Sequence, residues 1–173
     1  DDLKKRYDPC IKCIRRMNKP VIAAVNGVAA GAGCSLALAC DLRIASEHAS
    51  FIEVFVNVGL IPDSGSTWTL PRLVGWGRAM ELCCTGRPVK AEEALAIGLV
   101  NKVVAGDELE AAAAKMAGRI AGLPPRAIDL TKRLLNESWT NTLDEQLEAE
   151  AFAQETAGLT RDHFEGVTAF LEK

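Results

Sequence analysis

Residues 18–41 read Asn-Lys-Pro-Val-Ile-Ala-Ala-Val-Asn-Gly-Val-Ala-Ala-Gly-Ala-Gly-Cys-Ser-Leu-Ala-Leu-Ala-Cys-Asp. Residues 21–25 form a short apolar run, partly β-branched, directly after a proline, and this pattern predicts a fully buried strand. Gly31, Ala32 and Gly33 then open a run of small residues with high helix propensity, from residue 34 to residue 40. The sequence therefore predicts a strand, a glycine-rich turn and a helix in succession.

The start of the predicted helix is a candidate anion site, because free N–H groups and the positive end of the helix dipole lie there. A second loop, Ile-Pro-Asp-Ser-Gly, follows at residues 61–65 and contains Asp63. Taken alone, Asp63 is interpreted as a cap or turn residue, because this is ordinary turn chemistry. Its apolar sequence neighbours, among them Leu60 and Trp68, allow another interpretation, since a carboxylate partly removed from water suits a general acid or base. An anion-holding turn and a carboxylate are the parts of an enolate-forming site.

The composition favours a soluble globular chain. It has 173 residues, enough for a substantial core, of which 49% are hydrophobic and 25% are charged. The net charge of −3 gives no basic surface for nucleic acid or for an acidic membrane, and no apolar run is long enough to span a bilayer. We therefore expect neither a nucleic-acid partner nor a membrane partner.

The six cysteines do not have the spacing of a secreted disulfide framework, so we expect reduced thiols and a cytoplasmic protein. Cys10 and Cys13 have the C-x-x-C spacing of a metal or redox site. A zinc site needs a second ligand pair, and the sequence offers none at a suitable spacing. We expect no metal, and we expect both cysteines on the apolar face of a helix with Ile14 and Met17.

The remaining elements divide the chain into a strand-rich part, residues 1–104, and a helical part, residues 105–173. Further strands are expected at residues 41–46, 50–54 and 99–104. Helices are expected at residues 10–17, 90–97, 108–121, 125–137, 143–156 and 161–171, with another after the Asp63 loop that Ser64, Ser66 or Thr67 would cap. The C-terminal helices have apolar faces that cover either their own core or a partner subunit.

Two other interpretations of the motifs are weaker. The Gly31-Ala-Gly33-Cys-Ser-Leu36 stretch has only the first two glycines of a dinucleotide fingerprint. Ser35, His48 and Asp63 could form a hydrolase triad, but the second glycine of the G-x-S-x-G elbow is missing.

Several spaced motifs resemble the enoyl-CoA hydratase/isomerase (crotonase) family. They lie at residues 19–27, 31–34, 36–37, 40–41, 51, 59–62, 70–72, 86, 91, 94, 98–100 and 165–173. The resemblance implies an α/β fold, a crotonase-like spiral of ββα units with a C-terminal helical trimerisation region. It also implies acyl-CoA thioester substrates, whose enolate is held by two backbone N–H groups. Coenzyme A is then part of the substrate, and no other cofactor is expected.

Within this resemblance, one of the two oxyanion-hole amides falls on Ala32. The two catalytic glutamates of the hydratases fall on Ser35 and Phe55, which disfavours simple hydration. Asp63 falls where the family's double-bond isomerases carry their acidic residue, and residues 62–72 look most like its ring-epoxide isomerases of phenylacetate degradation. The resemblance also implies substrate contacts, which we assign to Gly31, Gly33, Phe55, Leu60 and Pro62.

The family's first half, with the other oxyanion amide and much of the coenzyme A pocket, has no counterpart in this sequence. Asp2 and Leu3 resemble the residues just after that amide, so we expect an N-terminal part of the fold to precede residue 1. The resulting hypothesis is an acyl-CoA isomerase that assembles as a homotrimer or a dimer of trimers. The alternatives are an enoyl-CoA hydratase and a non-catalytic acyl-CoA-binding homologue.

Overall fold

The computed structural model describes residues 2–172, which divide into two compact units. The first consists of residues 2–15 and 21–117, and the second of residues 16–20 and 118–172. All strands of the described residues belong to the first unit, whereas the second is built from helices. The expected division between residues 104 and 105 stays a prediction about function, because compactness alone does not define functional regions.

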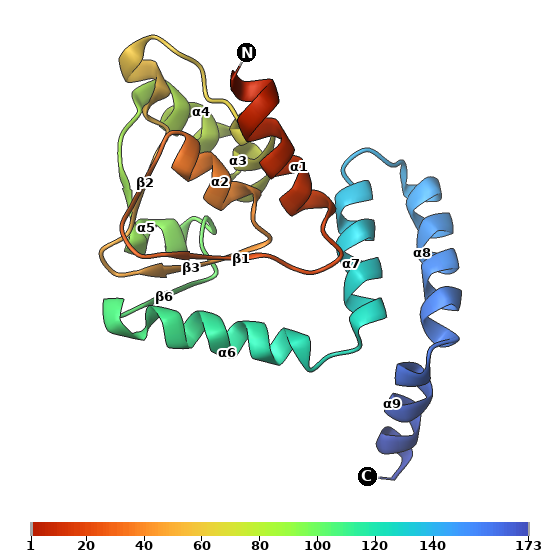
Figure 1. Ribbon diagram of the computed structural model, residues 1–173. Coiled ribbons are helices and arrows are strands. Elements are labelled where there is room, and N and C mark those ends of the chain that lie inside the picture. Colours follow the sequence, from red (N-terminus) through yellow and green to blue (C-terminus); the bar gives the residue numbers. More distant parts are fainter. Residues whose placement is uncertain (1, 173) are drawn as a thin grey trace. The chain divides into compact units, whose positions relative to one another are not determined.

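Two ββα units form the centre of the first unit. The first contains β1 (Ile22–Val25), β2 (Val28–Ala30) and α2 (Ala32–Ala39), and the second contains β3 (Leu42–Ser46), β4 (Ser50–Ile52) and α3 (Ser66–Val74). β1 pairs in parallel with β3 (Figure 1), and β2 pairs in parallel with β4. Each ββα unit thus gives one strand to each of two sheets, in agreement with the α/β spiral of ββα units that the family resemblance implies.

The other elements extend these sheets and cover them. β6 (Lys102–Val104) completes a parallel sheet in the order β1-β3-β6, and β5 (Val89–Lys90) pairs antiparallel with β4. A 3₁₀ turn (Val54–Val58) leads from β4 towards the loop before α3. The remaining helical segments are a π-helical turn (Leu3–Tyr7), α1 (Asp8–Arg16), α4 (Trp76–Thr85), α5 (Ala91–Ala96), a second 3₁₀ turn (Gly106–Glu108) and α6 (Leu109–Ala121).

The expectation that residues 21–25 form a fully buried strand is wrong. Ala24 is exposed and the other residues of β1 are half-buried, because β1 lies at one edge of its sheet in the described residues. The most buried strand is β3, in which only Leu42 is half-buried and whose Ile44 and Ala45 are completely inaccessible between β1 and β6. Leu38 of α2, Phe51 of β4 and Leu70 of α3 pack into the same core, each at most 2% exposed.

A buried arginine connects β3 to the chain just before β6. The Arg43 side chain donates from Nε to the carbonyl oxygen of Leu99 and from Nη1 to that of Cys40, both at 2.6 Å. The backbone N–H of Arg43 donates to Oδ1 of Asn101 at 2.8 Å. Because a buried charged group needs such partners, these bonds hold residues 99–101 beside β3.

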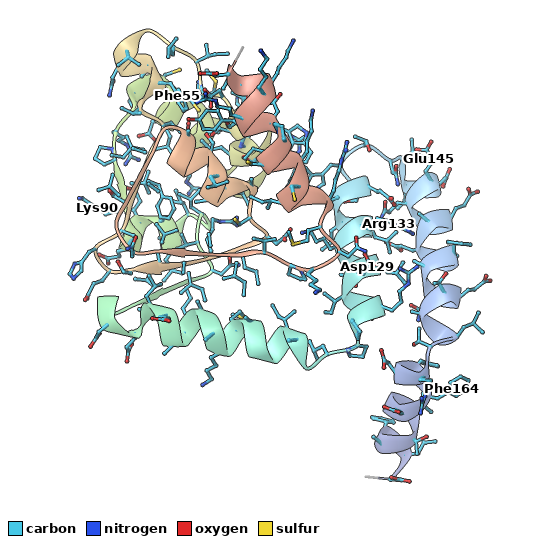
Figure 2. The ribbon with its side chains drawn as sticks, in the orientation of Figure 1. Phe55, Lys90, Asp129, Arg133, Glu145 and Phe164 are labelled. Atoms are coloured by element: carbon cyan, nitrogen blue, oxygen red, sulfur yellow. The ribbon has the colours of Figure 1, made fainter. Side chains whose placement is uncertain are left out.

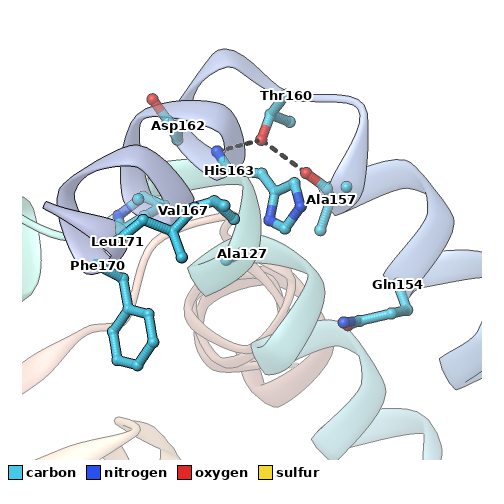
Figure 3. Close-up of a pocket in the computed structure, with 12 residues that line it drawn as sticks. Ala127, Gln154, Ala157, Thr160, Asp162, His163, Val167, Phe170 and Leu171 are labelled. Carbon is cyan, nitrogen blue, oxygen red and sulfur yellow. Dashed lines mark hydrogen bonds between the residues drawn. The ribbon is translucent and has the colours of Figure 1, made fainter.

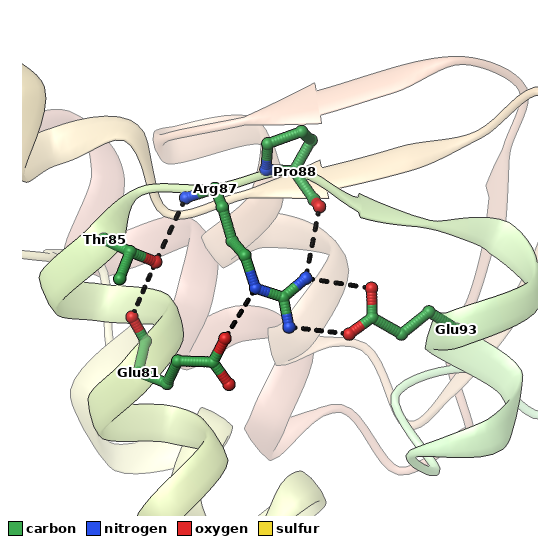
Figure 4. Close-up of polar contacts among 5 residues, drawn as sticks. All are labelled: Glu81, Thr85, Arg87, Pro88 and Glu93. Atoms are coloured by element: carbon green, nitrogen blue, oxygen red, sulfur yellow. Dashed lines mark hydrogen bonds and ion pairs between the residues drawn. The ribbon is translucent and has the colours of Figure 1, made fainter.

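A second arginine joins α4 to α5. The guanidinium of Arg87 donates to Glu81 at 2.6 Å and to both carboxylate oxygens of Glu93, at 2.9 and 2.7 Å (Figure 4). The side chains of these ion pairs are partly exposed to solvent, and exposed ion pairs contribute little to the free energy of unfolding. Their main effect is to orient the segment that leads into β5.

The second unit contains α7 (Pro125–Glu137), α8 (Leu143–Gly158) and α9 (Arg161–Leu171). α7 and α8 form an antiparallel pair (Figure 1), and Gln146 of α8 donates to the carbonyl oxygen of Leu134 of α7 at 3.2 Å. Thr142 and Glu145 form a capping box at the start of α8, with the Thr142 hydroxyl accepting from the Glu145 N–H. Phe164 of α9 is 64% exposed and projects away from its helix (Figure 2).

The expected orientation of α1 is wrong. Cys10 and Cys13 are exposed, as is Met17 just beyond α1, whereas Ile11 and Ile14 are half-buried. The helix therefore turns its isoleucines, and not its thiols, towards the unit. No helix within residues 2–172 is both long and apolar enough to cross a membrane.

Candidate active site

The glycine-rich turn ends β2 and begins α2. Gly31 has φ +54°, its N–H donates to the carbonyl oxygen of Ile52 at 2.9 Å, and its own carbonyl accepts from the Ser35 N–H at 2.9 Å. Ala32 is the first residue of α2, so its N–H has no acceptor within the helix. The turn thus has a backbone donor at a helix N-terminus, where negative charge is favoured.

Phe55 packs against this turn. A Cβ on Gly31 would lie 3.7 Å from Cζ of Phe55 and 3.3 Å from Cγ1 of Val54. The Phe55 side chain, labelled in Figure 2, is 7% exposed. At Gly33, in contrast to Gly31, an added Cβ would meet no atom within 4 Å. The structure therefore brings Gly31 and Phe55 together and leaves Gly33 open on one side.

Asp63 lies in the loop before α3 and is half-buried. Its Oδ1 accepts a hydrogen bond from the Ser64 hydroxyl at 2.8 Å, and its carbonyl accepts from the Ser66 N–H at 3.0 Å. The expected apolar surroundings are only partly present, because Leu60 and Ile61 are 62% and 79% exposed on the surface of the loop.

The expectation that Ser64, Ser66 or Thr67 caps α3 is also wrong. The N-cap residue is Gly65, with φ +81°, and no side chain accepts a hydrogen bond from the first turn. Ser64 has φ +52°, so two consecutive residues adopt left-handed conformations. The serine hydroxyls are used elsewhere: that of Ser64 by Asp63 and that of Ser66 by Glu53.

Glu53 is a buried acidic residue that the sequence reasoning missed. It is 3% exposed, and its Oε1 accepts a hydrogen bond from the Ser66 hydroxyl at 2.5 Å. Its Oε2 is buried and accepts no hydrogen bond of normal geometry, although the Cys34 thiol is close enough to lower the pKa of Glu53. Burial is the dominant influence and raises the pKa of Glu53, and the negative charge of Asp63 raises it further.

The position of Glu53 relates the two candidate catalytic segments. Cys34 is in the first turn of α2, two residues after Ala32, and Ser66 begins α3, three residues after Asp63. Because Glu53 lies beside both Cys34 and Ser66, the starts of α2 and α3 converge on one carboxyl group. The sequence contains a signal for Glu53. It lies two residues after the inward-facing Phe51, and side chains two residues apart in a strand point to the same face, so Glu53 is expected to point inward. A carboxyl group in that position needs hydrogen-bond partners.

The hydrolase triad is not assembled. Ser35 is completely buried, and its hydroxyl donates to the carbonyl oxygen of Gly31 at 3.2 Å. The imidazole of His48 is largely exposed in the turn after β3, 3.6 Å from a carboxylate oxygen of Glu47. Because the Ser35 hydroxyl is buried and bonded to Gly31 while the His48 imidazole faces solvent, the interpretation as a hydrolase triad is wrong. Within residues 2–172, no three His, Cys, Asp or Glu side chains form a group that could hold a metal ion.

The second unit contains a separate apolar groove of about 450 Å³ between the start of α7, the end of α8 and α9. Ala127, Val167, Phe170 and Leu171 contribute its apolar walls (Figure 3). At its rim, the Thr160 hydroxyl donates to the Ala157 carbonyl and accepts from the His163 N–H. The groove contains none of the residues of the glycine-rich turn or the Asp63 loop.

Comparison with known proteins gives a consistent result. A family model described as enoyl-CoA hydratase/isomerase matches residues 1–173. The chain is 44% identical over 171 residues to 1,2-epoxyphenylacetyl-CoA isomerase of Escherichia coli, and the match covers 99% of this chain and 65% of that protein. It is 47% identical over 162 residues to crotonyl-CoA hydratase of Syntrophomonas wolfei, covering 94% of this chain and 62% of that protein.

A solved structure agrees with these relatives. The crystal structure of enoyl-CoA hydratase from Bacillus anthracis superposes with a TM-score of 0.91 at 42% identity, covering 94% of this chain and 63% of that one. The chain thus spans less than two thirds of the length of each of these proteins.

Proposed function

Because this chain belongs to the enoyl-CoA hydratase/isomerase family, we propose that it carries the acid–base part of an acyl-CoA isomerase. The observation that carries the proposal is the identity of the side chains around the glycine-rich turn. Ser35 is buried and bonded to Gly31, and Phe55 is a buried aromatic residue, so neither can act as the acid–base glutamate of a hydratase. Asp63 is then the half-buried carboxylate that remains for proton transfer.

In the proposed reaction, the thioester carbonyl of an unsaturated acyl-CoA accepts a hydrogen bond from the Ala32 N–H. The Asp63 carboxylate removes a proton from the carbon next to the carbonyl, and the electron pair of the broken C–H bond moves onto the carbonyl oxygen as an enolate. The Ala32 N–H stabilises this negative charge at the start of α2. Asp63 then returns the proton to the far carbon of the allylic system, which shifts the double bond without oxidation or reduction.

A direct test is Asp63→Asn in the full-length protein. We expect a loss of isomerisation of about a hundredfold or more, with nearly unchanged acyl-CoA binding, because general acid–base catalysis commonly contributes that much. Asp107→Asn, in the 3₁₀ turn before α6, is the matched control. If Asp63→Asn keeps most of the isomerase activity, Asp63 is only a turn residue.

The substrate class can be tested in parallel. A 3-enoyl-CoA, crotonyl-CoA and a phenylacetyl-derived epoxide thioester would be assayed side by side with the same preparation. We expect rapid isomerisation of the enoyl or the epoxide substrate and slow hydration of crotonyl-CoA. Rapid hydration without isomerisation would identify a hydratase, and binding without turnover would identify a non-catalytic homologue.

We also propose a homotrimer or a dimer of trimers that assembles through the helical region. Large apolar side chains of α8 and α9 are exposed, including Leu143 and Phe170 at 74% and 78%. Light scattering on the full-length protein should give three or six times the mass of one subunit, and a monomer would contradict the proposal.

The proposed compartment is the cytoplasm, which is supported by six cysteines that form no disulfide within the described residues.

A further inference from the structure

We propose that Glu53 is a positioning residue: its carboxyl group holds the turn that carries Asp63 by accepting the hydrogen bond of the Ser66 hydroxyl. This inference rests on the proposed function, because it concerns the geometry of the proposed acid–base residue. It adds a residue to which the motifs of the sequence assign no role.

A short series of hydrogen bonds links the two acidic residues. Glu53 Oε1 accepts from the Ser66 hydroxyl, the Ser66 N–H donates to the Asp63 carbonyl at 3.0 Å, and the Ser64 hydroxyl donates to Oδ1 of Asp63 at 2.8 Å. A displacement of Ser66 from Glu53 therefore acts on the backbone that carries the Asp63 side chain.

The turn between Asp63 and Ser66 needs such a constraint. Ser64 and Gly65 have φ +52° and +81°, and a left-handed conformation is costly for a residue with a Cβ such as Ser64. Strained residues persist only where their surroundings determine the conformation. α3 has no side-chain cap at its start, so the bond between Ser66 and Glu53 is the side-chain contact that joins this helix start to β4 and the turn after it.

The surroundings of Glu53 favour its neutral form. The titratable and charged groups near it are Cys34 of α2, Asp63 of the loop, Cys83 of α4 and Arg87 before β5. The first three cannot supply a positive charge. Arg87 lines the same small cavity as Glu53 but gives its donors to Glu81 and Glu93, and no salt bridge to Glu53 occurs within residues 2–172.

The protonation of Glu53 has a consequence with a definite sign. Because burial raises the pKa of Glu53, the folded protein binds this proton more tightly than the unfolded chain does. The resulting contribution to stability is fully present below the unfolded-state pKa and is lost as the pH rises through the raised pKa. Above that point a buried, unpaired carboxylate repels Asp63 and weakens the order of the turn.

The experiment uses four single variants of the full-length protein and the double variant Glu53→Met/Ser66→Ala. Glu53→Gln keeps a neutral acceptor for Ser66, Glu53→Met removes the acceptor, and Ser66→Ala removes the donor. Ser46→Ala is the matched control, because Ser46 is another buried hydroxyl, which donates to the Asn26 carbonyl and contacts no residue of the turn through a hydrogen bond. The measurements are kcat and KM for isomerisation as a function of pH, and amide hydrogen exchange at residues 63–66.

Ser66→Ala and Glu53→Met should each lower kcat by about tenfold to a hundredfold with little change in KM, since small displacements of a catalytic group have effects of this size. The double variant should be no worse than either single variant, because both remove one interaction. Glu53→Gln should keep kcat within about threefold near neutral pH. Wild-type kcat should decline as the pH rises through the raised pKa of Glu53, and Glu53→Gln should lose this decline because glutamine does not titrate. Ser46→Ala should leave kcat and its pH profile unchanged.

The outcomes separate this inference from the proposed function. Unchanged kcat in both Ser66→Ala and Glu53→Met, in an enzyme that isomerises, would overturn the positioning role and leave the proposed function intact. If the wild type isomerises no acyl-CoA, the proposed function fails, and the positioning role of Glu53 is then tested by hydrogen exchange only. Faster exchange at residues 63–66 in Glu53→Met and Ser66→Ala, but not in Glu53→Gln or Ser46→Ala, then supports positioning, and unchanged exchange overturns it.

Discussion

Replacing Gly31 by alanine tests the geometry of the glycine-rich turn most directly. Gly31 has φ +54° and ψ −123°, a combination that residues with a Cβ rarely adopt. The new Cβ would also lie 3.3 Å from Cγ1 of Val54, so the Val54 side chain has to move by a few tenths of an ångström. The change therefore strains the backbone and crowds the contact with the residues after β4.

The strain of such a backbone position is about 1–3 kcal/mol, and the close contact adds to it. We expect a total loss of about 2–3 kcal/mol, which corresponds to a decrease in Tm of about 4–12 °C for a chain of this size. Gly33→Ala is the matched control two residues along, because Gly33 is within α2 and a Cβ there meets nothing within 4 Å. It should raise stability by up to about 1 kcal/mol, since alanine has the higher helix propensity.

Urea denaturation and thermal melting of the two variants and the wild type would measure the difference. Gly31→Ala should also slow isomerisation, because the strained turn displaces the Ala32 N–H. If Gly31→Ala is as stable as the wild type, or if both variants change stability equally, the backbone of the turn is not the one described.

Three further predictions concern the core, a helix cap and a thiol. Leu38→Ala should cost about 2–5 kcal/mol in unfolding experiments because it leaves a cavity in the core, whereas Leu36→Ala, on the exposed side of α2, should cost less than about 1 kcal/mol. Thr142→Ala should lower stability by about 1 kcal/mol through loss of the capping box, and Thr142→Ser should restore most of it; equal Tm values would contradict the cap. Burial raises the pKa of Cys83 to about 11, so its thiol should be alkylated slowly at pH 8 and faster as the pH approaches 11. Mass spectrometry would measure the alkylation rates of Cys83 and of the exposed Cys84 at pH 8, where Cys83 should be the slower; equal rates would refute this.

Local patterns were sufficient to predict most helices. The helical periodicity predicts α7 and α9 at their observed bounds, and Pro125 marks the start of α7. Apolar alternation predicts β3 and β4 closely. β2 and β5 could not be predicted, because they have three and two residues and are defined by pairing with β4. The burial of β1 was misjudged for a related reason, since exposure depends on how many strands lie beside it.

The candidate site was predictable only where local chemistry determines it. The glycine-rich turn and the Asp63 loop are visible as sequence motifs, and the structure places Ala32 at the first position of α2. Their functional roles stay predictions. The predicted cap of α3 was wrong because the N-cap position is Gly65, which has no side chain to accept a hydrogen bond. Glu53 was missed because a single acidic residue in a strand pattern is normally solvent-exposed, and its partners come from α2 and α3.

The bonds of Arg43 affect how the protein is made on the ribosome. Arg43 and its partner Asn101 are 58 positions apart, and β3 pairs with β6 over the same interval. At about 5–20 residues per second, synthesis takes about 3–12 s to extend from one to the other. During that interval β3 has an open edge and its arginine lacks the Leu99 carbonyl, so the nascent chain is exposed to pairing with other chains. The sheet β1-β3-β6 is therefore completed only after residue 104 has been synthesised, and chaperones that bind apolar edge strands should act before that point.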